Sequence, residues 1–150
     1  MNATIEKFGY PGSLVREYRH WLVLVRPAQV TAGSLVLAAK GDATAYGALP
    51  EAAFAEQGRV VADLESALTR LVNFDKINYL MLMMVDPHVH FHVFPRYAGE
   101  RSLAGMTMAD SGWPGPPDLA SAIFLDEAST EAVVRALVEV WPERSNQVGD

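Results

Sequence analysis

The sequence predicts a single α+β domain, in which antiparallel strands are combined with helices. Three observations support this class. Two short apolar runs flank a turn signal, a helical periodicity follows them, and two further apolar runs are joined by very few residues. Short connections favour antiparallel pairing, because a parallel crossover needs about a dozen residues or more. A chain of 150 residues is the size of one ordinary domain.

The first two strands are expected on either side of a tight turn. Residues 21–25 form a run of Trp, Leu and Val that ends before Pro27, and proline cannot donate a hydrogen bond to a strand ladder. Residues 34–39 form a second apolar run, and the turn falls at 31–33. Residues 1–19 are mixed in character and predict an irregular or helical lead-in.

A long amphipathic helix is expected from Pro50 onward, because proline suits the first helical turn. Charged residues fall on one side of this helix, and Asp63 is expected on the exposed surface among them. The pattern predicts a helix of about five turns. Apolar residues recur at the three- and four-residue spacing of the buried face: Val61, Leu64, Leu68 and Leu71.

Two strands are expected after the helix. Residues 77–85 are apolar on both alternations, which predicts a central strand covered on both faces. Asp86 and Pro87 interrupt the run, and a histidine-rich strand at 88–96 follows at once. So short a connection predicts that these two strands pair antiparallel.

The last third of the chain is expected to be looser. Residues 111–117 are rich in proline and glycine and predict an irregular loop. Apolar residues return at helical spacing over 133–141, and Pro142 stops that pattern. The sequence therefore predicts one short helix near the C-terminal end.

Composition and charge exclude several classes of function. The formal net charge is −6 without a long run of Lys or Arg, so the basic footprint of a general nucleic-acid binder is missing. The chain has no cysteine, which excludes disulfides, thiolate zinc sites and a cysteine nucleophile. Its longest apolar stretch, 80–85, is far shorter than the roughly 20 residues that span a bilayer, and residues 1–7 lack the layout of a secretory signal. We expect a cytoplasmic protein that does not bind membranes.

Three of the four histidines lie within five positions, at His88, His90 and His92. A strand sends successive side chains to opposite faces, so these three histidines share one face. The apolar residues between them share the other face. One face can therefore pack while the other reacts, and the clustering favours a functional site over three unrelated histidines.

The spacing of the histidines bears on the choice of a nucleophile. Alternate residues of a strand lie about 6.5 to 7 Å apart, so the outer two histidines are about 13 Å from each other. His90 is the member that has both others as neighbours. Its outer nitrogen can attack phosphorus if the inner N–H is held by an acceptor such as a backbone carbonyl. His88, His92 and backbone N–H groups can then stabilise the charge on the phosphoryl oxygens.

A metal site is the alternative interpretation of the triplet. One ion bound at about 2.0 to 2.1 Å can take two neighbouring histidines, but the outer pair is too far apart for all three to bind one ion. A three-histidine site would need His20 or a carboxylate from elsewhere in the chain. A serine-nucleophile elbow of the Gly-x-Ser-x-Gly type and a phosphate-binding Gly-x-x-x-x-Gly-Lys loop are both missing from the sequence.

The run from His88 to Arg96, His-Val-His-Phe-His-Val-Phe-Pro-Arg, matches the histidine triad signature. The chain therefore resembles the histidine triad (HIT) superfamily of nucleotide hydrolases and transferases. The likeness extends over about 21–97, where two strands, a long helix and two more strands follow in the family's order. We take residues 1–150 as a single HIT-like domain with this core, and 98–150 as a loop-rich C-terminal extension with a short helix.

The resemblance implies an antiparallel sheet of about five strands with one long and one short helix, and a homodimer whose sheets join across the interface. It implies that His90 is the nucleophile of a covalent nucleotidyl-histidine intermediate, and that His88 and His92 support the phosphate and the leaving group. Family substrates are dinucleoside polyphosphates, nucleoside phosphoramidates and similar small-molecule nucleotide conjugates. The scheme requires no cofactor and no bound metal.

The resemblance also implies that the nucleoside lies near the first strand, around Leu24 and Arg26. Arg26 and Arg96 are candidates to contact a small anionic ligand. Asn78, in the strand before the triad, is a further candidate contact.

Three positions depart from the family pattern. Ser34 follows Gly33 where many members have a histidine, and Arg26 stands where an asparagine commonly meets the ribose. Residues 84–87 replace a Gly-Gln-Ser or Gly-Gln-Thr segment that meets the phosphates in many members, and Asp86 can substitute for it only in part. The proposed nucleophile His90 is present. Because the residues expected to contact the ribose and the phosphates differ, this chain must bind its substrate differently.

The leading hypothesis is therefore an enzyme that cleaves or transfers a nucleoside monophosphate through His90. A second hypothesis is a nucleotide-binding module without catalysis, motivated by the missing phosphate-contacting segment. The third is a protein that binds a metal through its histidines. The sequence leaves the base, the leaving group and the acceptor of the substrate open.

Overall fold

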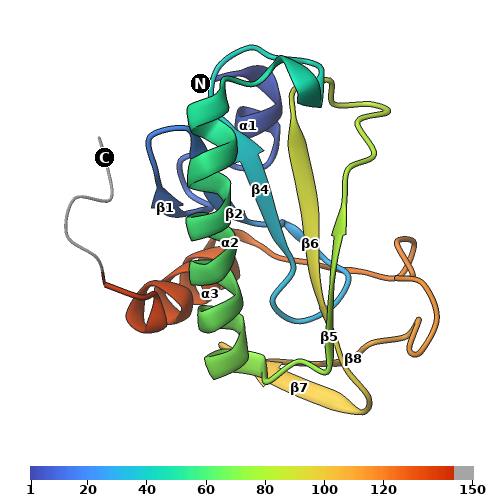
Figure 1. Cartoon of the computed structure of the whole chain (residues 1–150). Coiled ribbons are helices and arrows are strands. Elements are labelled where there is room, and N and C mark those ends of the chain that lie inside the picture. Colours follow the sequence, from blue (N-terminus) through green and yellow to red (C-terminus); the bar gives the residue numbers. More distant parts are fainter. Residues whose placement is uncertain (144–150) are drawn as a thin grey trace.

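The computed structural model describes residues 1–143 and has a five-stranded antiparallel sheet flanked by helices (Figure 1). The strands lie in the order β1-β2-β4-β6-β5, and all neighbours are antiparallel. Helix α2 (Glu51–Val72) crosses one face of this sheet, and the short helix α1 (Ala3–Lys7) lies on the other (Figure 1). The predicted α+β class with five antiparallel strands is confirmed. The strand bounds are Leu14–Glu17 (β1), Trp21–Val25 (β2), Leu35–Ala39 (β4), Lys76–Leu80 (β5) and His90–Arg96 (β6).

The two predicted N-terminal strands are confirmed as β2 and β4, which lie next to each other in the sheet. Every residue of both strands is buried, and Val23 lies opposite Leu37 in the register. The turn before β4 needs Gly33, whose φ of +98° lies in the left-handed region. A Cβ at this position would come within 3.1 Å of side-chain atoms of both Leu68 and Pro95. The chain can pass this close to α2 and β6 because glycine has no side chain.

Helix α2 confirms the predicted long helix and follows a short 3-10 helix, η1 (Tyr46–Ala48). Leu64 and Leu68 lie on its buried face. The predicted surface position of Asp63 is wrong, because this side chain is fully buried. Its Oδ2 accepts a hydrogen bond of 2.7 Å from the hydroxyl of Tyr18. The buried polar group thus has the partner that its burial requires.

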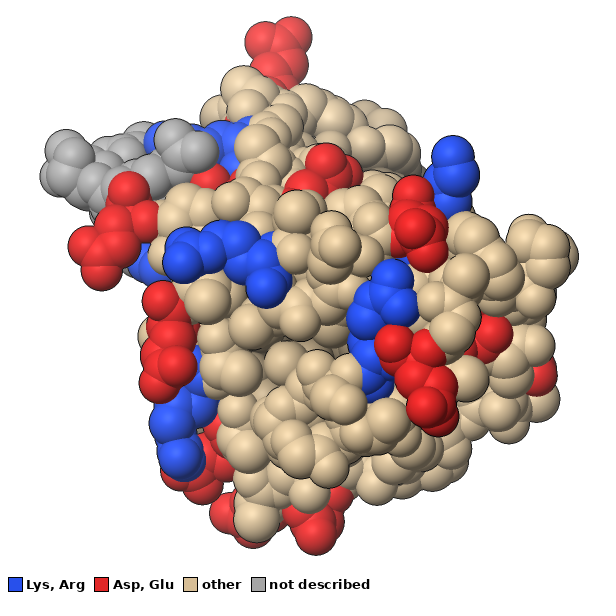
Figure 2. Space-filling model, turned by 90° about the horizontal axis from the view of Figure 1, so that it is seen from below, with Lys and Arg blue, Asp and Glu red and all other residues tan. Residues whose placement is uncertain are grey.

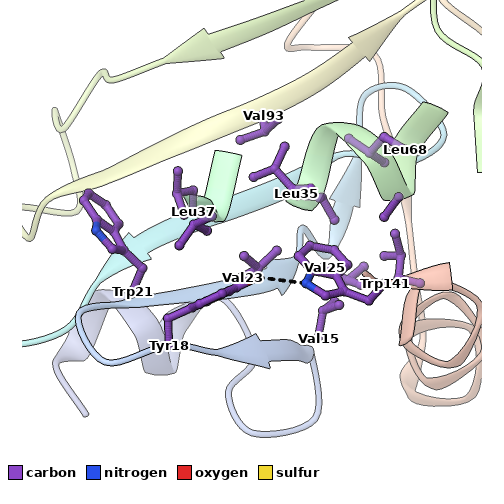
Figure 3. Packing of buried hydrophobic residues seen from close by; sticks show 14 of the residues in the cluster. Val15, Tyr18, Trp21, Val23, Val25, Leu35, Leu37, Leu68, Val93 and Trp141 are labelled. Carbon is purple, nitrogen blue, oxygen red and sulfur yellow. Dashed lines mark hydrogen bonds between the residues drawn. The ribbon is translucent and has the colours of Figure 1, made fainter. Parts of the chain in front are cut away.

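The main core lies between α2 and the sheet (Figure 3). Figure 3 shows side chains of three adjacent strands, among them Val23, Leu35 and Val93, packed toward the helix. Trp141 closes this core, and its indole N–H donates to the hydroxyl of Tyr18 at 2.8 Å, drawn as the dashed line. A smaller cluster packs on the opposite face of the sheet and consists of Ile5, Phe8, Leu22, Leu24, Val36 and Ala38.

Strand β5 is the last strand of the sheet, so the prediction of a central strand at 77–85 is wrong. It ends at Leu80, and its residues are half-buried or exposed. The following apolar residues belong to a loop, in which Leu82, Met84 and Val85 are exposed. Apolar character on both alternations does not distinguish a strand buried on both faces from an edge strand that continues into an apolar loop.

The part of the chain after residue 97 contains more regular structure than the predicted loop-rich extension. A hairpin follows β6, a short strand pairs with the turn region after β2, and the predicted C-terminal helix is present. That helix begins earlier than expected, because the side chain of Asp126 accepts the N–H of Ser129 at 2.7 Å and caps its start. Residues 144–150 of the predicted extension lie outside the described residues. The elements are β3 (Ala28–Gln29), β7 (Glu100–Leu103), β8 (Met106–Ala109), β9 (Ile123–Phe124) and α3 (Glu127–Val140).

Charged side chains are dispersed over the face of the molecule seen in Figure 2. Lys and Arg occur there in separate places beside Asp and Glu, and they do not merge into one basic area. Within residues 1–143, no helix is long and apolar enough to cross a membrane.

Candidate functional site

A pocket of about 330 Å³ lies on the sheet face that carries the histidines. Helix α1, the end of β2, strand β6 and the loop after β5 all contribute to its lining. Phe8 and the loop residues 82–85 supply the apolar part. Charged groups of both signs and two imidazoles therefore meet in one cavity. The polar and charged lining residues are Lys7, Arg26, Asp86, His90 and His92.

The pairing of β6 with β4 places His90 and His92 side by side. His90 lies opposite Ala38 and His92 opposite Val36, so both imidazoles project from one face of the sheet, as the alternation predicts. Their ring centroids are 5.0 Å apart. The ring of Phe8 lies 5.5 Å from one imidazole and 5.6 Å from the other. The intervening apolar residues pack against the main core on the opposite face.

His88 lies just before the strand, so the predicted strand at 88–96 begins two residues too early. Its imidazole is half-buried, and Nδ1 lies 2.9 Å from the hydroxyl oxygen of Thr4 in α1. The same oxygen accepts the backbone N–H of His88 at 3.3 Å. Thr4 therefore holds both the side chain and the main chain of His88. His88 is thus held beside the pocket and does not line it.

The ring of His90 is fixed by the main chain two residues earlier. Its Nδ1 lies 2.7 Å from the carbonyl oxygen of His88. Because a carbonyl oxygen only accepts hydrogen bonds, Nδ1 carries the hydrogen and Nε2 keeps a lone pair in the neutral ring. The sequence argument requires this arrangement for an attacking histidine. His90 is 1% exposed and still lines the pocket, so the free nitrogen is sheltered from bulk water.

Arg26 holds the ring of His92, and here Nδ1 accepts a hydrogen bond, whereas Nδ1 of His90 donates one. The Nε–H of Arg26 donates to Nδ1 of His92 at 3.2 Å, which leaves the ring hydrogen on Nε2. Burial, the positive charge of Arg26 and the neighbouring His90 lower the pKa of His92 to about 4, while Asp86 acts in the opposite direction. His92 is therefore neutral near neutral pH and carries its hydrogen on Nε2.

Arg26, a predicted nucleotide contact, lines the pocket and is anchored at several points. Its Nη1 donates to the carbonyl of Ala28 at 2.6 Å. Its Cζ lies 5.5 Å from the ring centroid of Phe94, and that ring stacks on His92. Burial lowers the pKa of Arg26 from its ordinary value. The guanidinium is therefore part of the support of the histidine strand.

Three other predicted nucleotide contacts lie outside the pocket lining. Leu24 has no exposed surface because it is enclosed in the small cluster under α1, so its predicted contact with a nucleoside is wrong. Arg96 is 3% exposed and donates to Asp110 through Nε at 2.6 Å and to Asn78 through Nη1 at 2.7 Å. These side chains join β6, β5 and the segment after β8. Asn78 and Arg96 thus have structural partners in this part of the sheet, and their contact with a nucleotide stays a prediction.

Helix α1 supplies contacts to the site that the sequence analysis missed. Thr4 holds His88, although 84 positions separate them. Lys7 forms an ion pair of 2.8 Å with Asp86, which joins two walls of the pocket. No local pattern in the N-terminal segment signals these contacts, because they depend on the tertiary path of the chain.

A larger hollow of about 530 Å³ lies at the turn between β1 and β2, and no triad histidine lines it. Glu56 of α2 fixes this turn by accepting the backbone N–H of Arg19 at 3.2 Å and that of His20 at 2.7 Å. The structure places His20 here, so it does not join the triad in a three-histidine metal site. Within residues 1–143, no group of three His, Asp or Glu side chains has a geometry that could hold a metal ion.

No family model matches the chain, and no curated protein sequence matches it either. Solved structures match over nearly the whole length. A histidine triad protein from Bradyrhizobium japonicum is 20% identical with a TM-score of 0.71, and the match covers 94% of this chain and 97% of that protein. A histidine triad protein from Sinorhizobium meliloti is 18% identical with a TM-score of 0.71, and the match covers 93% of this chain and 95% of that one.

A further match is a hypothetical histidine triad nucleotide-binding protein from Sulfolobus tokodaii. It is 18% identical with a TM-score of 0.66, and the match covers 91% of this chain and 88% of that protein. At these identities the similarity establishes the fold. The candidate pocket therefore lies on an architecture that all three of these proteins share.

Proposed function

Because the chain has the fold of the histidine triad proteins, we propose that it is a nucleotide hydrolase or nucleotidyl transferase. Its substrate is a nucleoside phosphate conjugate, such as a dinucleoside polyphosphate or a phosphoramidate. The observation that carries the proposal is the hydrogen bond of 2.7 Å between Nδ1 of His90 and the carbonyl oxygen of His88. This bond leaves the Nε2 lone pair free to attack phosphorus inside a pocket.

The proposed reaction has two steps. First, Nε2 of His90 attacks the phosphorus, the bond from phosphorus to the leaving group breaks, and the leaving group departs with its electron pair and takes up a proton from solvent water. The ring becomes a nucleotidyl-histidine, and the carbonyl of His88 stabilises its positive charge through Nδ1–H. Water or another hydroxyl acceptor then attacks the same phosphorus and releases a proton to solvent, the phosphorus–nitrogen bond breaks with its electron pair returning to Nε2, and the neutral imidazole is restored.

His92 and Lys7 can support the charge on the phosphate. The ring of His92 is adjacent to the nucleophile, and its Nε2–H is a neutral hydrogen-bond donor. Lys7 is half-exposed on α1 and is held by Asp86, so a phosphate in the pocket competes with this carboxylate for the ammonium group. The proposed steps use only groups of this chain, and independence from a cofactor is part of the proposal.

The loop residues 82–85 favour a second candidate function. Their side chains are apolar, and Met84 is 88% exposed, so they offer the phosphates no hydroxyl or amide. Phosphoryl transfer depends mainly on positioning and on stabilising charge. A module that binds nucleotides without turning them over is therefore the second candidate.

Mass spectrometry of the protein after incubation with a panel of nucleotide conjugates tests the proposal. We expect a nucleotidyl adduct on the peptide that carries His90, together with release of the leaving group. His90→Ala should fold and lose turnover by at least about 100-fold, whereas His20→Ala, outside the pocket, should keep both adduct and turnover. Binding in a thermal-shift assay, with neither adduct nor product from the wild-type protein, would support the binding module instead.

We also propose a homodimer in which two sheets join along β5. Among the described strands, β5 pairs on one side only, with β6, so its other edge can pair with a second copy. The exposed apolar residues Leu82, Met84 and Val85 follow it directly, and such residues are typical of association surfaces. Analytical ultracentrifugation should give a dimer for the wild type and a weaker one for Met84→Glu. A wild-type monomer at all concentrations would contradict this arrangement.

A further inference from the structure

Arg26 reaches the histidine pocket from the end of β2. Its backbone N–H donates to the carbonyl of Ser34 at 3.0 Å, which continues the pairing of β2 with β4 by one residue. In the register of the sheet, Leu24, Val36 and His92 form one row. Because Arg26 comes two residues after Leu24, its side chain lies on the same face as His92.

The guanidinium of Arg26 has an acceptor at each end. Nη1 donates to the carbonyl of Ala28 at 2.6 Å, and Nε donates to Nδ1 of His92 at 3.2 Å. A guanidinium has only N–H donors and no acceptor, so the contact with His92 has one possible direction. Nδ1 of His92 must present its lone pair, and the hydrogen of the neutral ring must lie on Nε2.

We propose that Arg26 is a positioning residue, whose Nε–H fixes His92 in the Nε2–H tautomer and so gives the two adjacent imidazoles different tasks. His90, held by a carbonyl oxygen through Nδ1–H, keeps its lone pair on Nε2. His92, held by Arg26 through its Nδ1 lone pair, keeps a hydrogen on Nε2. The pair thus offers one nucleophile and one hydrogen-bond donor. The catalytic consequence of this assignment rests on the proposed function.

The positive charges around His92 favour a neutral ring, and the hydrogen bond from Arg26 likewise requires an unprotonated Nδ1. Burial, Arg26 and His90 hold its pKa low, Asp86 raises it, and Lys7 lines the same pocket from α1. A proton on Nδ1 of His92 would break the contact with Arg26 and bring two positive charges together. His92 is therefore neutral near neutral pH in the ligand-free pocket.

The assignment differs from a direct contact between Arg26 and the nucleotide. The guanidinium packs over the ring of Phe94, which is stacked on His92 with an interplanar angle of 5°. Arg26, His92 and Phe94 thus form one packed unit. An arginine built into this unit acts on the reacting groups through the orientation of His92, which affects kcat more than KM.

Nitrogen-15 NMR of the imidazoles tests the proposal without a substrate. In the wild type we expect His92 with Nδ1 unprotonated and the hydrogen on Nε2. In Arg26→Met we expect mixed tautomers and a pKa that rises toward the ordinary value of 6.5. Lys7→Met is the matched control, because it removes a second cation from the lining without touching a histidine nitrogen, and it should leave the tautomer unchanged. A wild-type His92 with its hydrogen on Nδ1 overturns the proposal, as does an unchanged tautomer in Arg26→Met.

Steady-state kinetics give a second readout. Arg26→Met should lower kcat by about 10- to 100-fold and change KM much less. A raised KM with an unchanged kcat would mean that Arg26 serves nucleotide binding alone, which overturns its positioning role. If the wild-type protein turns over no nucleotide, the proposed function fails. The tautomer of His92 then still decides whether Arg26 positions this ring.

Discussion

The hydroxyl oxygen of Thr4 lies 2.9 Å from Nδ1 of His88, although the two residues are 84 positions apart in the sequence. Thr4 is buried and also accepts the backbone N–H of His88 at 3.3 Å. A hydroxyl group can both donate and accept, so it can stay bonded to His88 in either protonation state of the imidazole. The first histidine of the triad is therefore held by helix α1, whereas the other two belong to strand β6.

Thr4→Val removes this hydroxyl and keeps the shape of the side chain. We expect the free energy of unfolding to fall by about 1 to 2 kcal/mol, because the backbone N–H of His88 loses its acceptor. Urea denaturation measures the change. Thr4→Ser is the matched control and should keep most of the stability, since the hydroxyl remains. Equal losses in the two variants would show that the methyl group stabilises this contact and the hydroxyl does not.

The low pKa of His92 makes the stability of the fold depend on pH. The folded protein takes up this proton only near pH 4, whereas a histidine in the unfolded chain takes it up near pH 6.5. The contribution is complete above pH 6.5 and is lost as the pH falls toward 4. This contribution of His92 to the free energy of unfolding is at most about 3 kcal/mol. Urea denaturation at several pH values should show this slope in the wild type and a smaller slope in His92→Gln. Identical slopes in both proteins would contradict the prediction.

Asp110→Ala should be strongly destabilising, because it leaves the buried guanidinium of Arg96 without its charged partner. We expect a loss of about 3 to 5 kcal/mol in the free energy of unfolding. The exposed ion pair of Arg135 and Glu131 on α3 provides the control, and Glu131→Ala should change stability by less than about 0.5 kcal/mol. Thermal unfolding of both variants measures the difference. A mild effect of Asp110→Ala would show that water reaches Arg96.

Gly33→Ala should destabilise the fold by about 1 to 3 kcal/mol. The added Cβ would lie 3.1 Å from atoms of Leu68 and Pro95, on a backbone with φ of +98°. Gly58→Ala is the matched control, because a Cβ at that helical position meets nothing within 4 Å. It should stabilise α2 by up to about 1 kcal/mol. Chemical denaturation of the two variants should therefore shift in opposite directions, and shifts of the same sign would contradict the assignment.

The sequence predicts best those elements in which the spacing of the apolar residues is the same as the spacing of the buried positions. Strands β2 and β4 are continuous apolar runs between turn signals, and α2 carries its apolar residues at helical spacing. The alternation around His90 and His92 predicts the face on which both rings lie. In each case the residues of one continuous segment are enough to predict the element and its buried face.

The parts that the sequence does not predict depend on contacts between distant segments. The local sequence predicts a surface position for Asp63, whereas its carboxylate is buried and accepts a hydrogen bond from Tyr18 in the turn between β1 and β2. The apolar run that contains β5 gives no sign that the strand lies at the edge of the sheet. The partner of Arg26 could not be predicted, because an arginine beside a phosphate site and an arginine bonded to a histidine look the same in sequence.

Asn2 fastens α1 to the end of β4. Its side-chain oxygen accepts the N–H of Ile5 at 2.9 Å, and its Nδ2 donates to the carbonyl of Gly41 at 2.7 Å. These contacts connect Asn2 to the helix that bears Thr4, and Thr4 in turn binds His88. Assays of histidine-pocket variants that carry an N-terminal purification tag should therefore be repeated after the tag has been removed.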